Sequence, residues 1–262
     1  MIDRLLRAGL RLRCGAVPTA ALLFVFGAAT ADAAIVNSLR GFARDEPGWS
    51  GSVSGSFGAS GGNTRETTYE AAGRLQWRGA VNTWRLIGSG KRTTSRGEET
   101  ARSTLGHLRH NRELADRWFS LAFLQIQKNP FQRLDSRFLA GVGVRWDTVK
   151  RDKFIWAFGA STMYEDERIN NVAGHETAHR LSTFSTIETE LREGVTLDAL
   201  LFYQPQWSDF GDWRVFGQAK LEVELTGSLS LFTSYQIEHD SRPPAGVEQT
   251  DWDTKTGFLM KF

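Results

Sequence analysis

The stretch Lys255-Thr256-Gly257-Phe258-Leu259-Met260-Lys261-Phe262 ends the sequence with an alternation of side-chain types. Successive side chains of a β-strand point to opposite faces. One face would carry Trp252, Thr254, Thr256, Phe258, Met260 and Phe262, and the other Asp253, Lys255, Gly257, Leu259 and Lys261. The stretch therefore predicts a strand with one mainly apolar face and one mainly polar or small face.

The same stretch resembles the C-terminal assembly signal of bacterial outer-membrane β-barrels. That signal has a polar residue, a glycine two positions later, a hydrophobic residue three further on and a terminal aromatic. Lys255, Gly257, Met260 and Phe262 occupy these positions. The resemblance implies that the barrel-assembly machinery binds this strand, which then closes the barrel against the first strand. The alternative is an ordinary edge strand with a fortuitous Phe.

The beginning of the sequence predicts a secretory signal peptide over residues 1–33. Arg4, Arg7, Arg11 and Arg13 precede a short apolar run over 20–29, and Ala31-Asp32-Ala33 fits a small-residue cleavage site. The apolar run is too short for a bilayer-spanning helix, which needs about 20 residues. A short periplasmic lead-in is expected over 34–47, before a barrel over 48–262.

Alternation with a period of two continues through most of residues 48–262 and predicts about twelve antiparallel strands. The faces of the segments at 101–127 are ambiguous. Short predicted turns, such as 79–82, alternate with mostly longer loops, such as 165–176 and 205–212. Alternating segments of about ten residues with unequal loops are typical of transmembrane barrels. A soluble β-sandwich also alternates, but its outer face should be polar. We therefore predict an all-β transmembrane barrel in the outer membrane of a Gram-negative bacterium, in contact with its lipids.

Tryptophans recur near the ends of the predicted strands, where an interfacial aromatic girdle would place them. They are Trp49, Trp77, Trp84, Trp146, Trp213 and Trp252.

Charge and cysteine content exclude several functional classes. The 32 basic and 30 acidic residues become 28 of each once residues 1–33 are removed, so nothing favours nucleic-acid binding. Cys14 is the only cysteine and lies in the predicted signal peptide. The mature chain is thus expected to have no disulfide and no thiol catalysis. No cofactor is expected, and the sequence does not define an oligomeric state.

Three stretches are similar to an uncharacterised outer-membrane family known as putative salt-stress-induced outer membrane proteins. They are 49–64, the run Leu114-Ala115-Asp116-Arg117-Trp118-Phe119, and the run Phe131-Gln132-Arg133-Leu134-Asp135-Ser136-Arg137. The resemblance implies a link to salt or osmotic stress. It brings no reaction or ligand.

Enzymatic and metal sites are not expected. Ser103 and His107 would share a strand face, but nothing marks them as nucleophile and base. His175, Glu176 and His179 fall at a loop-to-strand boundary, so the helical zinc-protease pattern does not apply.

The predicted inner face separates its charges along the chain. Early strands contribute a basic wall of Arg74, Arg78, Arg85, Lys91, Arg137 and Arg145. Later strands contribute an acidic wall of Glu188, Glu190, Asp198, Glu222, Glu224 and Glu238. Two interpretations stay open, a narrow pore for small polar or zwitterionic solutes, and a non-conducting barrel that supports the envelope or binds a partner.

The terminal motif generates a first prediction. Phe262→Ser should lower the amount of protein in the outer membrane and leave aggregated or degraded chain in the periplasm, as measured by fractionation. Normal insertion of this variant would mean that the motif is fortuitous.

Overall fold

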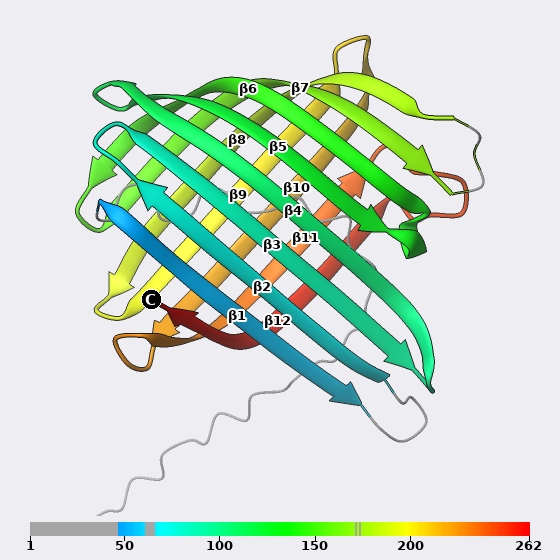
Figure 1. Ribbon diagram of the computed structural model, residues 1–262, viewed down its shortest axis with the longest axis horizontal. Helices are drawn as coiled ribbons and strands as arrows, with labels where there is room; N and C mark the ends of the chain where they lie inside the picture. Colours follow the sequence, from blue (N-terminus) through cyan, green and yellow to red (C-terminus); the bar gives the residue numbers. More distant parts are fainter. Residues whose placement is uncertain (1–46, 61–65, 171, 173) are drawn as a thin grey trace, which may run out of the picture.

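Twelve antiparallel strands close into one barrel in the computed structural model, which describes residues 47–60, 66–170, 172 and 174–262 (Figure 1). Each strand pairs with its neighbours in the sequence, and β1 closes against β12. The strands are β1 Gly48–Ser60, β2 Glu66–Arg78, β3 Asn82–Ser95, β4 Glu98–Ala115, β5 Trp118–Asn129, β6 Leu134–Arg151, β7 Phe154–Ile169, β8 Glu176–Arg192, β9 Val195–Gln206, β10 Asp209–Glu224, β11 Leu229–Asp240 and β12 Thr250–Lys261. The predicted fold class is confirmed. The predicted signal peptide (1–33) and nearly all of the predicted lead-in (34–47) lie outside the described residues.

The connections fall at two ends of the barrel. Gly48 and Phe262 lie at one end, here called the terminal end, and the opposite end is called the distal end. Distal connections include a 3₁₀ turn at Pro130–Gln132 (η1) and the segment 241–249. No helix in the part of the chain that is described has the length and apolar character needed to cross a bilayer.

Two predicted loops are shorter in the structure. The loop expected at 205–212 is a two-residue turn between Gln206 and Asp209, and the loop expected at 165–176 begins only after β7 ends at Ile169. In both places the alternation of side chains continues into polar sequence, because a barrel strand can extend beyond the hydrocarbon with polar residues on both faces. The expected difference in loop length therefore holds for only some distal connections, since 96–97 is also a two-residue turn.

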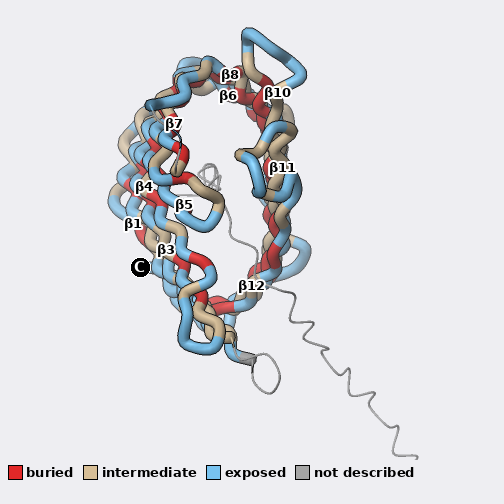
Figure 2. Tube along the Cα trace, turned by 90° about the vertical axis from the view of Figure 1, so that its right-hand side faces the viewer, coloured by how far each residue is buried: buried red, intermediate tan, exposed pale blue. Residues whose placement is uncertain are grey.

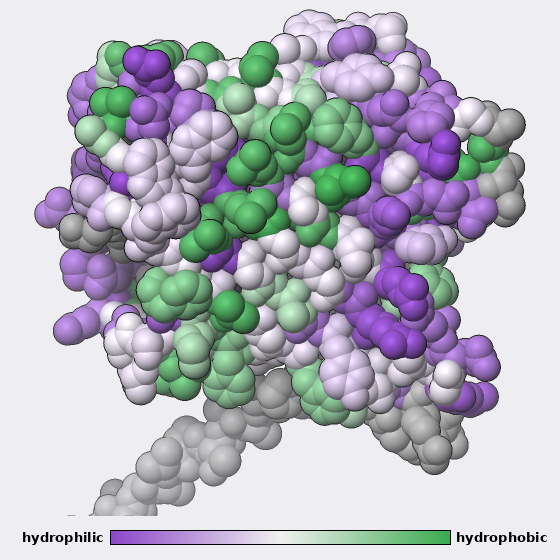
Figure 3. Space-filling view, in the orientation of Figure 1, coloured by the Kyte–Doolittle hydropathy of each residue, from purple (hydrophilic) through white to green (hydrophobic). Residues whose placement is uncertain are grey.

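The outer face carries the apolar side chains. Val53, Leu86, Val142, Leu201 and Phe258 are all exposed there. In Figure 3 apolar side chains gather on the middle of the visible face, and hydrophilic ones are denser toward its right-hand end. An apolar outer band between polar ends is the surface that a bilayer requires.

Tryptophans form the predicted girdle at the terminal end. Trp49, Trp77 and Trp84 lie side by side in register on β1, β2 and β3. Trp118 and Trp146 stack on β5 and β6, with ring centroids 5.8 Å apart. Trp213 and Trp252 lie toward the distal end of β10 and β12. Indole rings favour the membrane–water interface, so the girdle marks one boundary of the apolar band.

The inner face is polar on most strands, and the faces that the sequence left ambiguous are resolved. Leu105, His107, Arg109 and Asn111 of β4 point inward and are buried, as are Leu121, Gln125 and Gln127 of β5. Figure 2 shows an oval ring of strands in which buried positions recur along the wall.

The seam between β1 and β12 depends on close backbone approach at Gly257. A Cβ atom at this position would lie 2.5 Å from the carbonyl oxygen of Gly55 and 3.0 Å from Cβ of Ser56. Nearer the terminal end of the same seam, Gly51 and Phe262 exchange two backbone hydrogen bonds, of 2.9 and 3.1 Å. The glycine of the predicted assembly motif thus has a structural reason, since any side chain would push the closing strand away.

Gly257→Ala is therefore expected to destabilise the closed barrel by about 1–3 kcal/mol, the usual cost of overpacking. The urea midpoint for loss of the compact, heat-modifiable gel form measures it. Gly73→Ala is the matched control, because nothing lies within 4 Å of a Cβ added there. An equal effect of both substitutions would contradict this account of the seam.

Candidate functional site: a charged vestibule above an apolar cluster

The distal half of the barrel interior contains a cavity of about 620 Å³, here called the vestibule. Strands β5 to β12, the turn at η1 and the segment 241–249 contribute its lining. Eight carboxylates and five arginines line it, so its formal charge is about −3. The acidic residues are Glu165, Glu167, Glu176, Asp212, Glu238, Asp240, Glu248 and Asp251, and the basic ones are Arg133, Arg137, Arg180, Arg214 and Arg242.

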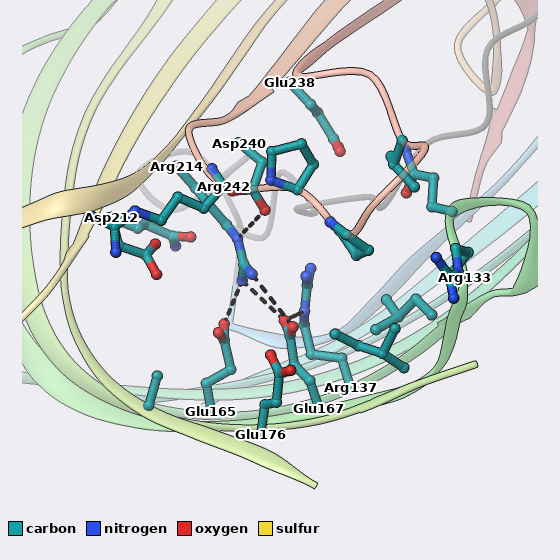
Figure 4. Close-up of a pocket in the computed structure, with 18 of the residues that line it drawn as sticks. Arg133, Arg137, Glu165, Glu167, Glu176, Asp212, Arg214, Glu238, Asp240 and Arg242 are labelled. Atoms are coloured by element: carbon teal, nitrogen blue, oxygen red, sulfur yellow. Dashed lines mark hydrogen bonds and ion pairs between the residues drawn. The ribbon is translucent and has the colours of Figure 1, made fainter. Parts of the chain in front are cut away.

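Arg214 is the central residue of the vestibule (Figure 4). It extends from β10 to β7, which is not a neighbouring strand, and so crosses the interior. Its Nη1 lies 2.7 Å from Oε2 of Glu165 and 3.0 Å from Oε1 of Glu167. Its Nε donates to Oδ2 of Asp240 at 2.8 Å.

Two further arginines complete the network. Arg180 on β8 donates from Nε to Oε1 of Glu165 at 3.1 Å and from Nη1 to Oδ1 of Asp212 at 2.8 Å. Arg137 on β6 donates to Glu167. Guanidinium groups suit such a network because each offers five donors in a fixed planar fork. Three arginines and four carboxylates are thereby held in one connected arrangement.

Directly below the vestibule the interior becomes apolar. Leu121, Phe184, Leu200, Phe202 and Phe216 pack together, with Phe123 against them, and form what we call the inner apolar cluster. Four strands show the same change on going from the distal end toward the terminal end. The next inward residue after Gln125 is Phe123 on β5, after Gln204 it is Phe202 on β9, and after Arg214 it is Phe216 on β10. On β8 Ser182 lies between Arg180 and Phe184. The cluster therefore forms the floor of the vestibule.

The cluster has contacts both with neighbouring strands and with the opposite wall of the barrel. A Cβ atom at Gly159 would overlap the ring of Phe184, so this glycine makes room for the aromatic side chain. Arg109 of β4 reaches across the interior and places its guanidinium carbon 5.7 Å from the centroid of the Phe184 ring. His107 stacks on Phe123 at 5.7 Å and contacts Gln125 at 2.9 Å through Nδ1.

Burial at this level shows how tightly the interior is filled. Arg109 is 3% exposed and Phe216 is completely buried. Nearer the terminal end, Arg85 is 1% exposed and Arg145 is 2% exposed. A water-filled passage beside these side chains would leave them accessible, so in this conformation the inside of the barrel is packed around these four side chains.

All twelve residues of the two predicted charged walls belong to the inner alternation of their strands, but they are distributed over the full height of the barrel. Only Arg137 and Glu238 line the vestibule. Several have partners close by. Arg145 pairs with Asp147 at 2.5 Å, Lys91 with Asp253 at 3.2 Å, and Glu222 with Lys261 at 2.6 Å. Local pairing reduces the field that two opposed walls would produce, while the functional role of the walls stays a prediction.

Sequence reasoning missed the main residues of the vestibule. The loops predicted at 165–176 and 205–212 include Glu165 and Asp212, and neither predicted wall includes Arg180 or Arg214. The sequence does indicate where Glu165 and Glu167 point. The every-second-residue pattern of inward positions Ser161, Met163, Glu165 and Glu167 continues beyond the apolar part of β7. The sequence also indicates that the cluster points inward. Phe184, Phe202 and Phe216 lie on the same strand face as the polar residues two positions away from them.

The histidines that the sequence singled out are in separate surroundings. His107 is buried on the inner face, whereas His175 is exposed and contacts Asp166 at 2.6 Å. Within the described ranges, no group of three His, Cys, Asp or Glu side chains is arranged to hold a metal ion.

The fold and the apolar outer band define the class of protein, an outer-membrane β-barrel of a Gram-negative bacterium. Several solved structures share the fold, and two of them are an outer-membrane channel and a porin. The COG4313 outer membrane channel from Pseudomonas putida F1 has a TM-score of 0.54 at 10% identity, covering 85% of this chain and 98% of that chain. The NanC porin has a TM-score of 0.50 at 12% identity, and the match covers 80% of this chain and 98% of the porin chain.

The chain belongs to the family described as protein of unknown function, DUF481, whose pattern matches residues 54–262. A comparison with curated protein sequences gives no match. The family description names no activity, and the function must be argued from the vestibule and its floor.

The network around Arg214 generates a stability prediction. Arg214→Met leaves Glu165 and Glu167 without their cross-barrel partner, and removal of one member of a buried pair costs roughly 3–5 kcal/mol. We expect the low end of this range because water in the vestibule can solvate the carboxylates. Chemical unfolding followed by tryptophan fluorescence measures it.

Arg242→Met is the control, because Arg242 and Asp209 form an exposed pair whose loss should cost under about 1 kcal/mol. Equal losses of stability in the two variants would contradict a structural role for the Arg214 network.

Proposed function

We propose that the protein is a narrow outer-membrane channel for small polar solutes, with a preference for zwitterionic or cationic ones. The charge of the vestibule carries this proposal: eight carboxylates face five arginines within about 620 Å³. Charges in a confined cavity are screened less than surface charges, so an excess of carboxylates favours solutes with an ammonium group. The arginines supply sites for the carboxylate of a zwitterion.

Passage requires the inner apolar cluster to move. The floor of the vestibule is closed at Phe184 and Phe216, so a solute that enters from the distal end stops there in this conformation. Side chains can change rotamer without movement of the strands, and aromatic constrictions can gate a pore by excluding water. We therefore expect low, intermittent conductance.

A second candidate is a non-conducting barrel that binds a solute or partner in the vestibule. The closed floor is the observation that favours it. Under this alternative the cluster is a permanent plug, and the paired charges below it serve stability alone.

Single-channel recording separates the two candidates. The channel proposal expects brief openings of the wild-type protein and longer or larger ones in Phe184→Ala/Phe216→Ala, because both substitutions remove side-chain volume from the floor. Wild-type protein without any openings, together with steady conductance of the double variant, would favour the non-conducting barrel.

Selectivity gives an independent test of the acidic vestibule. Replacing Glu176, Glu238 and Glu248 with Gln should shift the reversal potential in a salt gradient toward anions, and the shift should shrink as salt rises. Glu193→Gln is the control, since Glu193 lies in a turn at the terminal end. An unchanged reversal potential in the triple variant would contradict the proposed preference.

The proposal has further parts that rest on sequence resemblance. A link to salt or osmotic stress would appear as slower growth of a deletion strain at high salt. Recognition of the terminal strand by the barrel-assembly machinery and the absence of enzymatic activity stay predictions. We further propose that the distal end faces the exterior, as the expected periplasmic position of both termini implies.

A further inference from the structure

Two connections at the distal end meet across the opening of the barrel. One is the η1 turn between β5 and β6, and the other is the segment 241–249 between β11 and β12. In the ring of twelve strands these two connections lie opposite each other. Figure 2 shows β5 and β11 on opposite sides of the oval ring. Contacts between the two connections therefore span the distal opening, and we call the joined pair the mouth bridge.

Arg133, which follows η1, makes the main contact of the mouth bridge. Its Nη1 donates a hydrogen bond to the carbonyl oxygen of Ala245 at 2.7 Å, and its Nη2 donates to that of Asn170 at 3.1 Å. The carbonyl oxygen of Arg133 also accepts a hydrogen bond from the amide of Asn170 at 2.7 Å. One residue thus ties together three distal connections, those between β5 and β6, β7 and β8, and β11 and β12. Figure 4 shows Arg133 at the edge of the vestibule.

The backbone at Arg133 is in a conformation that arginine rarely adopts. Its φ is 61°, in the left-handed region, and its amide donates to the carbonyl oxygen of Pro130 at 3.0 Å. Glycine and asparagine adopt this conformation more readily than other residues. Strained backbone of this kind clusters at functional positions. The turn alone would favour glycine or asparagine, so the contact across the mouth is a reason for an arginine here.

A second contact joins the same two sides of the mouth. Nε2 of Gln132 donates to Oδ2 of Asp251, the second residue of β12, at 2.7 Å. The side-chain amide of Asn129 donates in turn to Oε1 of Gln132 at 2.8 Å, which orients the glutamine. The mouth bridge therefore consists of two parallel contacts, one to the segment 241–249 and one to the start of β12.

The segment 241–249 is fixed at its base. The hydroxyl of Ser241 donates to the carbonyl oxygen of Gly211 at 3.2 Å and accepts from the amide of Trp213 at 2.8 Å. Both partners belong to β10, so the base of the segment is attached to the neighbouring hairpin. The segment is therefore positioned by the barrel wall before it reaches the other side of the mouth.

The tip of the segment is a tight turn that presents one carbonyl group. The amide of Val247 donates to the carbonyl oxygen of Pro244 at 3.0 Å, and Gly246 has a φ of 84°. A positive φ at the third residue defines a type II turn. Ala245 is the second residue of this turn, and its carbonyl oxygen is the acceptor for Arg133. A stiff tip of this kind holds the acceptor in place, because the ring of Pro244 fixes its φ.

The mouth bridge lies over the vestibule. Gln132, Arg133, Ala245 and Asp251, which form its two contacts, all line that cavity. A solute that enters from the distal end must therefore pass beside these residues. The width of its path depends on whether the two contacts are made.

We propose that the mouth bridge sets the upper size of the solutes that enter the vestibule, with Gln132 and Arg133 as specificity-determining residues. Small solutes pass beside the closed bridge, whereas bulky ones are excluded while its contacts hold. The inference rests on the proposed entry of solutes into the vestibule from the distal end. It does not depend on passage through the inner apolar cluster.

Crosslinking tests whether the mouth bridge exists in a membrane. In a Cys14→Ser background, Arg133→Cys/Ala245→Cys should be joined within one chain by a short bismaleimide, because the side chain of Arg133 reaches Ala245. The reaction is run in vesicles and read as a shift in gel migration relative to the two single-cysteine variants. Absence of the crosslinked form would overturn the proposal.

A charge-balanced pair of variants tests the function of the bridge. Arg133→Asn/Asp251→Ala removes both contacts and leaves the formal charge of the vestibule unchanged, since one cation and one anion are lost. Asparagine tolerates the left-handed conformation, so the turn after η1 should keep its fold. Arg242→Asn/Glu248→Ala is the matched control, because it makes the same two kinds of change in the segment 241–249 and leaves both bridge contacts in place.

The readout is the reactivity of a cysteine at Gln204, which lines both the vestibule and the inner apolar cluster beneath it. Two membrane-impermeant maleimides are added to the distal side of oriented vesicles, one small and one attached to a short polyethylene glycol chain. The bulky reagent should modify Gln204→Cys several-fold faster when the bridge contacts are removed. The rate of the small reagent should stay the same, and the control variant should match the parent.

The ratio of the two rates decides between the outcomes. An unchanged ratio in Arg133→Asn/Asp251→Ala, or an equal change in the control variant, would overturn the mouth bridge as a size filter while entry of small solutes stands. Failure of the small reagent to react in every variant would contradict entry into the vestibule itself, and would overturn both the proposed function and this inference.

Discussion

Backbone hydrogen bonding in a bilayer is the constraint on which this structure depends. Strands that cross hydrocarbon must find all their backbone partners within the chain, and a ring of antiparallel strands is the one sheet that does so. The alternation of side chains follows from the ring, because each strand then has one face toward lipid and one toward the interior. The apolar outer band, the tryptophan girdle and the glycine at the closing strand are consequences of the same requirement.

A barrel of twelve strands encloses an interior wide enough to be either packed with side chains or filled with water. Here the two halves of the interior are filled differently. The distal half holds a cavity of about 620 Å³ with paired charges around Arg214, and below it six apolar side chains join opposite walls. Buried ion pairs are weak contributors to stability compared with apolar packing. Breaking the network at Arg214 alone is costly because buried carboxylates lose a partner, but apolar packing of similar volume in place of the whole network would be about as stable. Stability of the fold therefore does not by itself require charges at this place.

Much of the architecture could be predicted from the sequence, because alternation is a local property of each strand. The inner or outer position of most residues in β1, β2, β3 and β10 followed from polarity alone. Prediction was poorer where inner positions are apolar, as at Phe184 and Phe216, because polarity no longer separates the faces. It was also poorer where strands extend into polar sequence, as at Glu165 and Asp212. The pairing of Arg214 with β7 depends on barrel closure, which brings distant strands together, and no local pattern encodes it.

The central claim is that the vestibule is open at the distal end and closed at the inner apolar cluster. Cysteine accessibility measures this directly, with a membrane-impermeant thiol reagent added from the distal side of oriented vesicles. Gln206 lies in the vestibule and Asp198 lies beyond the cluster on the same face of β9. In a Cys14→Ser background, the account predicts rapid modification of Gln206→Cys and at least a tenfold slower reaction of Asp198→Cys, about 1.4 kcal/mol in accessibility. Equal rates at the two positions would show a continuous aqueous lumen and contradict the account.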